Sequence, residues 1–277
     1  MSEPITIPAL APAQADFFWF MGPDAVRFLN DLVSQEVAAA PIGSVRRSLL
    51  LTPQGKMQFL MWLLRGEARV GVMVEDGLGD SLVETLRRYL IRVDVEIAES
   101  ADPVALVVGE GVEQGRWKES DGSLVADVSW AGLRRALVVG DIPTLPVLEG
   151  DEYTSLRIRA GEPVMGRDVD ENTIPQETGL VPASVSFEKG CFLGQELVAR
   201  LDSRGGRVNR HLRILEVDGT AGVGSAVTKD GEPVGEVSSA ADGLALALLH
   251  RRVEAGDEVQ VGGLTAHVRP VPENPET

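Results

Sequence analysis

Residues 258–268 read EVQVGGLTAHV, so polar and apolar side chains alternate on both sides of the Gly262-Gly263 pair. Alternation with a period of two is typical of a half-buried strand, and paired glycines favour a tight hairpin turn. The same turn signal occurs at Asp230-Gly231 and Asp242-Gly243, between other strand-like stretches. We therefore expect a small antiparallel β-barrel over residues 210–271, followed by a frayed tail at 272–277.

The chain before residue 210 mixes two kinds of periodicity. Apolar residues three and four apart predict helices near 26–33 and 82–90, and a third helix over 151–160 ends before Gly161 and Pro163. A short helix is expected over 110–117. Strand-like runs occupy 48–52, 57–64, 69–74, 93–97, 104–108 and 133–139. Strands and helices interleaved in this way predict α+β lobes of the split-βαβ type.

The composition excludes several classes of protein. With 42 acidic against 26 basic residues, the chain carries a net charge of −16. A surface this acidic repels phosphate groups, so we expect no direct nucleic-acid partner and no membrane binding. One cysteine rules out an intramolecular disulfide, and the first 14 residues lack the basic region of a signal or transit peptide. These features predict a cytoplasmic protein.

The only cysteine, Cys191, lies between Gly190 and Gly194 in the stretch from Phe187 to Arg200. If Cys191 lies near the N-terminus of a following helix, the helix dipole and Lys189 both favour the thiolate and lower the pKa of the thiol. The alternative is a small buried hydrophobic residue, which is the role of most lone cysteines.

The next stretch reverses the sign of the charge. Five arginines at positions 200, 204, 207, 210 and 213 face a single acid, Asp202. They are suited to a glutamate tail, a phosphate or an acidic partner. The alternative is a solvated loop whose arginines pair with carboxylates elsewhere in the fold.

The sequence lacks the residues that several other kinds of functional site require. The three histidines are far apart in sequence and, with one cysteine, do not give the spacing of a metal site, so no metal is predicted. An iron–sulfur cluster normally needs four thiolates, so any role with clusters must be indirect or shared between chains. Walker, dinucleotide-binding and Gly-x-Ser-x-Gly motifs do not occur.

The cysteine stretch resembles the Lys-Gly-Cys-(Phe/Tyr)-x-Gly-Gln-Glu motif of the YgfZ family, which here runs from Lys189 to Glu196. The resemblance continues through residues 198–200 (VAR) and 204–205 (RG). Segments 156–163 (LRIRAGEP) and 174–177 (IPQE) resemble segments shared by YgfZ proteins and the glycine-cleavage T-protein, and 51–57 (LTPQGKM) fits as well. Together these segments cover most of the chain.

This resemblance implies a T-protein-like fold of the α+β class. Two interlocked α+β lobes, of the ferredoxin-like or split-βαβ type, would form a folate-binding region over residues 1–209, with an internal boundary near residue 100. The C-terminal antiparallel β-barrel would follow over 210–271. The barrel expected from the hairpin spacing agrees with this plan.

The resemblance also implies a tetrahydrofolate-binding protein that assembles or repairs iron–sulfur clusters. Its partners would be iron–sulfur assembly or client proteins, including enzymes that methylthiolate tRNA. On this basis Cys191 becomes the working thiol with Lys189 beside it, and Glu177 falls where the T-protein hydrogen-bonds the pterin ring of folate. Further folate contacts are expected from Gln195, Arg200, Arg204 and Arg207. The alternative for Glu177 is a plain surface glutamate.

The comparison with the T-protein fails at one place. A catalytic aspartate pair follows a Gly-Gly turn in that enzyme, whereas the matching stretch here places Phe59 and Leu60 at the two positions. Apolar side chains cannot orient or exchange protons at a folate nitrogen, so aminomethyltransferase activity is not expected. Two alternatives stay open: a folate-dependent one-carbon transferase with its carboxylate at Asp168 or Asp170, and a non-catalytic scaffold for cluster-carrying proteins.

Overall fold

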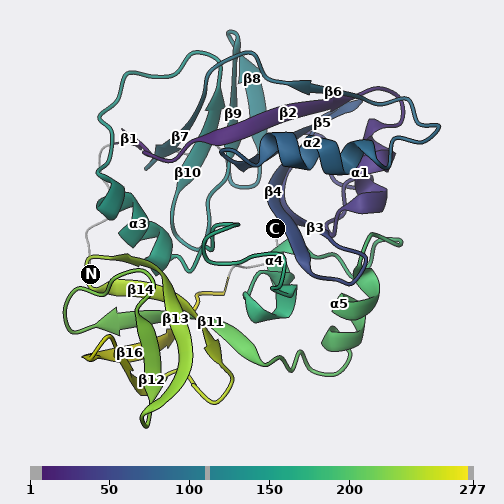
Figure 1. Cartoon of the computed structure of the whole chain (residues 1–277). Helices are drawn as coiled ribbons and strands as arrows, with labels where there is room; N and C mark the ends of the chain where they lie inside the picture. Colours follow the sequence, from purple (N-terminus) through teal and green to yellow (C-terminus); the bar gives the residue numbers. More distant parts are fainter. Residues whose placement is uncertain (1–7, 110–112, 274–277) are drawn as a thin grey trace.

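The computed structural model describes residues 8–109 and 113–273, and it contains two five-stranded antiparallel sheets and a closed barrel (Figure 1). The first sheet has the strand order β3-β4-β5-β2-β6. Its strands are β2 (Ala15–Met21), β3 (Val45–Leu51), β4 (Met57–Arg65), β5 (Arg69–Glu75) and β6 (Glu96–Glu99). The last strand begins three residues later than the alternation at 93–97 predicted.

Two helices cover one face of the first sheet (Figure 1). Helix α1 (Ala25–Leu32) and helix α2 (Gly79–Arg87) form where the helical spacing predicted them. They bury Leu29 and Leu86 in one apolar cluster with Phe20 and Phe59 of the sheet. Since β4 also faces a second sheet on its other side, its middle is apolar throughout rather than alternating.

The second sheet has the order β1-β7-β10-β9-β8. Its strands are β1 (Ala9–Leu10), β7 (Val104–Val108), β8 (Trp117–Ser120), β9 (Ser123–Asp127) and β10 (Arg135–Val139). The start of the chain belongs to this sheet, because β1 pairs with β7, and this pairing interlocks the two lobes. Leu106 and Leu137 pack against Phe17 and Leu64 of the first sheet.

The helix expected over 110–117 falls partly on residues 110–112, which lie outside the described residues. Its remaining part was predicted wrongly, since residues 113–116 form a turn and an isolated bridge and Trp117 begins β8. Two glycines and several charged residues gave too little apolar periodicity to separate a helix from a loop there.

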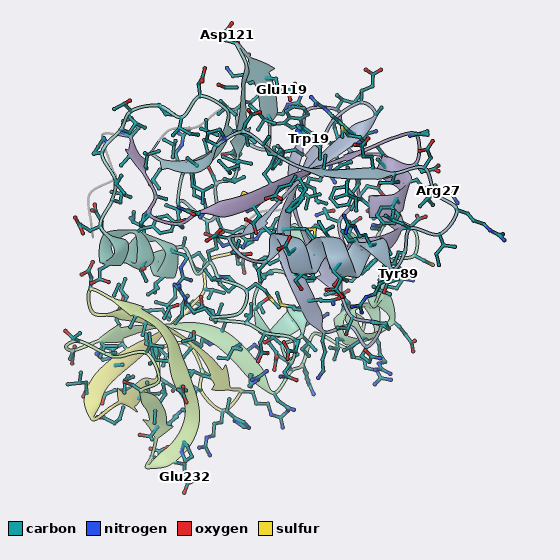
Figure 2. All side chains as sticks on the ribbon, turned by 45° about the horizontal axis from the view of Figure 1, so that its top comes forward. Trp19, Arg27, Tyr89, Glu119, Asp121 and Glu232 are labelled. Atoms are coloured by element: carbon teal, nitrogen blue, oxygen red, sulfur yellow. The ribbon has the colours of Figure 1, made fainter. Side chains whose placement is uncertain are left out.

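The two sheets are also joined near their outer edge by an arginine between two tryptophans. The guanidinium carbon of Arg69 lies 3.9 Å from the ring centre of Trp19 and 5.9 Å from that of Trp117. Arg69 also donates two hydrogen bonds of 2.7 Å to Glu119. Figure 2 shows Trp19 and Glu119 in this region, while Asp121 marks the outermost turn of the second sheet.

A segment of short helices connects the sheets to the barrel. It contains α3 (Gly150–Arg159), the 3₁₀ turn η1 (Pro175–Glu177), α4 (Val181–Ser184) and α5 (Gln195–Asp202). Helix α3 ends where Gly161, with φ of +62°, was expected to stop it. It packs between the sheets and the barrel, burying Ile158 against Leu212 and Leu246 (Figure 1).

The barrel closes in the order β11-β14-β13-β12-β15-β16, as the hairpin pattern predicted. Its strands are β11 (Arg210–Val217), β12 (Ala226–Lys229), β13 (Glu232–Ala241), β14 (Leu244–His250), β15 (Glu258–Val261) and β16 (Leu264–Pro270). All three turn dipeptides have positive φ at both residues, as a tight hairpin of this kind requires. Val259, Val261 and Val268 point into the barrel core. Glu232 marks its far end in Figure 2.

Candidate functional site

A cavity of about 630 Å³ lies where the two sheets, α3 and the loop after α3 meet. Its wall includes Leu60 and Trp62 of β4, Arg47 of β3, and Arg135 of β10. Glu162, from the loop after α3, also lines it. The volume is in the range of pockets that hold small organic ligands.

Glu162 links two arginines on the wall of this cavity. Its Oε1 atom accepts hydrogen bonds from Arg47 Nη1 at 2.5 Å and from Arg135 Nη2 at 2.8 Å. Arg135 Nη1 also donates to the Tyr153 hydroxyl at 2.6 Å. All three charged residues are at most 4% exposed. Burial alone would raise the pKa of Glu162, but the charges of Arg135 and Arg47 outweigh it and lower that pKa to about 2.

Several buried polar atoms of the cavity residues have no hydrogen-bond partner in the described part of the chain. They are Glu162 Oε2, Arg47 Nε, Arg135 Nε and Glu75 Oε2. A buried polar atom without a partner costs about 1–3 kcal/mol, so such atoms mark places that a ligand or water satisfies. The arrangement offers two acceptors and two donors to whatever enters the cavity.

Aromatic rings hold Arg47 in place from its other side. Its guanidinium carbon lies 4.2 Å from the ring centre of Trp130 and 5.2 Å from that of Trp62, and the two rings meet edge to face. An arginine packed on rings in this way has little freedom to change rotamer. The unpartnered Nε is therefore presented in a fixed direction.

Cys191 lies on a different surface. It is exposed, which excludes the buried-hydrophobe alternative. It borders a shallow hollow of about 310 Å³ together with Lys189, Phe187 and Gln195, and this hollow shares no lining residue with the central cavity. Cys191 and the central cavity therefore belong to two separate surfaces of the molecule.

Lys189 has other partners than the thiol. Its Nζ donates to the carbonyl oxygens of Asn30, Val33 and Gln35 at 2.5, 2.6 and 3.0 Å, at the C-terminal end of α1. Burial lowers the pKa of Lys189 to about 8, against the charges of Glu36 and Asp31. These three bonds use all three ammonium protons, so Lys189 fastens the cysteine loop to α1.

Gln195 also has a structural role. Its side-chain oxygen accepts a hydrogen bond from the Phe192 N–H at 3.1 Å, just before α5 begins. Gly194 adopts φ of +77°, and a side chain there would come within 2.4 Å of the Thr52 carbonyl oxygen. Gly194 is thus needed because the loop packs against the turn at residues 52–55. Neither Gln195 nor Lys189 reaches the central cavity.

Glu177 is buried, which excludes the surface alternative, but it does not line the cavity. Its two carboxylate oxygens accept from Arg210 Nε and Nη2, both at 3.0 Å, and Oε2 also accepts from the Ile174 N–H at 3.2 Å. The expected pair of contacts to a pterin is therefore used by an arginine at the start of the barrel. The role of Glu177 as a folate contact stays a prediction, and it would require the ion pair between Glu177 and Arg210 to open.

The arginines expected to hold a folate tail point elsewhere. Arg200, Arg204 and Arg207 are exposed, on and just after α5, and none lines the central cavity.

The two carboxylates of the transferase alternative have structural partners. Asp168 is buried between Arg157 and the hydroxyl groups of Ser238 and Ser239. Asp170 closes a turn with Asn172 and Thr173.

The residues that build the cavity were not predicted from the sequence. Arg47, Glu75 and Arg135 are charged residues in or at the end of apolar strands, and that mismatch was the available signal. Glu162 lay inside the segment 156–163 used for the resemblance but was given no role.

In the described ranges, no group of three His, Cys, Asp or Glu side chains is placed to hold a metal ion. Nor does that part of the chain contain a helix long and apolar enough to cross a membrane.

Comparison with known proteins agrees with this architecture. Residues 209–275 match the family model of the CAF17 C-terminal beta-barrel domain. A tRNA-modifying protein YgfZ of Cronobacter sakazakii is 27% identical over 91% of this chain and 88% of its own. The YgfZ protein of Pectobacterium atrosepticum is 26% identical, over 67% of this chain and 63% of its own length.

Aminomethyltransferases are similar at nearly the same level. That of Thermotoga petrophila is 24% identical over 88% of this chain and 78% of its own. The crystal structure of the glycine cleavage system aminomethyltransferase T from Bartonella henselae superposes with a TM-score of 0.81 at 18% identity, covering 98% of this chain and 88% of that one. The T-protein-like fold expected from the sequence is confirmed.

Proposed function

We propose that this chain, a member of the YgfZ family related to the aminomethyltransferases, binds a reduced folate in its central cavity and acts in iron–sulfur cluster assembly or repair. The enzymes that depend on it would be iron–sulfur enzymes such as those that methylthiolate tRNA. The folate would supply one-carbon chemistry, and the partners would be cluster-assembly or client proteins. The YgfZ relatives are named tRNA-modifying proteins, which supports this direction.

The observation that carries the folate assignment is the set of unpartnered atoms on Glu162, Arg47 and Arg135. A pterin carries N–H donors next to a carbonyl acceptor on one edge of its ring. Glu162 Oε2 is a permanent acceptor because its carboxyl group stays ionised, and the two Nε–H groups are donors. The three residues thus complement a pterin edge, and they replace Glu177 as the proposed pterin contacts.

The cavity also argues against aminomethyl transfer by the mechanism of the T-protein. Leu60 lines the cavity, whereas Phe59 packs in the apolar cluster on the opposite face of the sheet. The position that faces the ligand therefore carries an isobutyl group, which exchanges no proton. The exposed Cys191 would act outside the cavity, on a partner protein that reaches the shallow hollow beside it.

Binding of tetrahydrofolate to the purified protein, followed by isothermal titration calorimetry, tests the folate assignment. We expect saturable binding to wild type and at least a tenfold loss of affinity in Glu162→Gln, because a buried charged acceptor is removed. Glu216→Gln is a matched control, since Glu216 also pairs with an arginine, Arg269, but on the exposed side of the barrel. Equal affinity of Glu162→Gln and wild type would refute the proposed site.

A further inference from the structure

Glu75 is the last residue of β5 and lies in the wall of the central cavity. The residue is partly exposed, but its Oε2 atom is buried and has no hydrogen-bond partner in the described ranges. Strands β4 and β5 pair with Trp62 opposite Met73, and Glu75 follows Met73 by two residues along β5. Because Leu60, Trp62 and Met73 all line the cavity, the carboxyl group stands against an apolar wall.

Charged and titratable groups from several elements line the same cavity as this carboxyl group. Arg47 of β3 attracts its negative charge, and Glu162 repels it. The others on the cavity wall are Asp76 beside it, Arg135 of β10, Tyr153 and Arg157 of α3, and Arg167 of the following loop. Arg135 and Arg157 are already bonded to Glu162 and Asp168, respectively.

The two glutamates of the cavity have opposite protonation behaviour. Burial raises the pKa of Glu75 to about 7, although the charge of Arg47 and the N–H groups of Glu75 and Met165 oppose the shift. Glu162, held by two arginines, has its pKa lowered to about 2. When neighbouring carboxyl groups have pKa values pushed apart in this way, one serves as a fixed acceptor and the other exchanges protons.

We propose that Glu75 is the proton-exchanging group of the central cavity and selects ligands that present an N–H donor to its Oε2 atom. This inference rests on the proposed folate site and adds a pH-dependent specificity residue to it. Glu75 lines the cavity at the end of β5, and strands β4 and β5 contain no other acid.

The proton balance of binding follows directly. A ligand N–H that donates to Oε2 favours the carboxylate, so a neutral Glu75 gives its proton to the solvent while the ligand keeps its own. Affinity therefore rises with pH as the free carboxyl group ionises. With a free-state pKa of about 7, the affinity increases about tenfold between pH 6 and pH 8.

The test is calorimetric titration with tetrahydrofolate at pH 6, 7 and 8, repeated in phosphate and Tris buffers to count released protons. We expect wild type to release protons at pH 6 and to gain about tenfold in affinity by pH 8. Glu75→Gln should bind more weakly at pH 8, with neither proton release nor this pH dependence. Glu67→Gln, at the exposed far end of the same hairpin, should behave as wild type. Identical pH profiles in wild type and Glu75→Gln would overturn the proposal.

A second measurement needs no ligand and separates the two proposals. Carbon-13 NMR of protein labelled at the glutamate carboxyl carbons, compared with Glu75→Gln, identifies the Glu75 signal. Titration of that signal near neutral pH supports proton exchange by Glu75 even if tetrahydrofolate fails to bind and the folate assignment falls. Titration in the ordinary glutamate range, near pH 4, overturns the proposal even if folate binds.

Discussion

In the central cavity four buried polar atoms lack partners among the described residues, whereas the cysteine loop, residues 187–194, contains no buried side-chain polar atom without a partner. Lys189 is fully bonded to α1, and Gln195 just after the loop bonds its backbone. The cavity is thus organised for something that enters it. The loop is organised to hold itself in place and to present one exposed thiol.

The difference shows that a motif that stands out in the sequence need not be the place where a ligand binds. The cysteine motif is a continuous run of residues because the loop needs Gly194 and its anchor Lys189 close together along the chain. The cavity takes its charged residues from β3, β5, β10 and the loop after α3, which only the fold brings together. Two sites with separate linings should therefore respond separately to substitution, and the following predictions test that independence.

The largest expected effect is on function in the cell. In a strain that lacks the gene, wild type should restore iron–sulfur-dependent tRNA methylthiolation and Cys191→Ser should not, because the exposed thiol is the proposed reactive group. Purified Cys191→Ser should still bind tetrahydrofolate within twofold of wild type, since Cys191 does not line the cavity. Full rescue by Cys191→Ser would show that the thiol is not required. Loss of folate binding in this variant would show that the two sites are not independent.

Glu162→Gln should give the largest loss of stability. It leaves Arg47 and Arg135 buried without their shared counter-charge, which costs about 3–5 kcal/mol in the free energy of unfolding. The matched control Glu216→Gln removes an exposed ion pair and should cost less than about 1 kcal/mol. Urea denaturation followed by circular dichroism measures both. Equal losses would mean that the Glu162 network contributes nothing beyond a surface pair.

Lys189→Met tests the loop without touching the cavity. Removing three hydrogen bonds to the end of α1 should lower the free energy of unfolding by about 1–3 kcal/mol. Amide hydrogen exchange should become faster at residues 30–35 and 187–194, with folate affinity unchanged. If exchange in both segments stayed at the wild-type rate, Lys189 would not be the anchor that its bonds indicate.

Much of the architecture was predictable, for physical reasons that the barrel illustrates. Val259 and Val261 alternate with polar residues because one face of β15 is buried, and the paired turn residues have the positive φ values that tight hairpins need. The site was predictable only in part. Residue chemistry alone left Cys191 open between a buried residue and a functional thiol; the thiol is exposed, and its role stays a prediction. The sequence could not show that Glu177 pairs with Arg210, 33 residues later on the barrel, or that Glu162 meets Arg47 across 115 residues.

The smallest expected effect is on the pH dependence of stability, which reports on Glu75 in the protein without added ligand. Because the pKa of Glu75 is raised from an ordinary 4.5 to about 7, its neutral form stabilises the fold at low pH, and this contribution is lost as pH rises through 7. A full shift of this size corresponds to about 3 kcal/mol, and partial solvent access reduces the expected effect to about 1 kcal/mol. Glu75→Gln, which stays neutral, should therefore unfold at a higher temperature than wild type at pH 8 and at nearly the same temperature at pH 5. Thermal unfolding at both pH values, with Glu67→Gln as the control, measures this difference. An equal difference at the two pH values would show that the carboxyl group does not change its charge in this range.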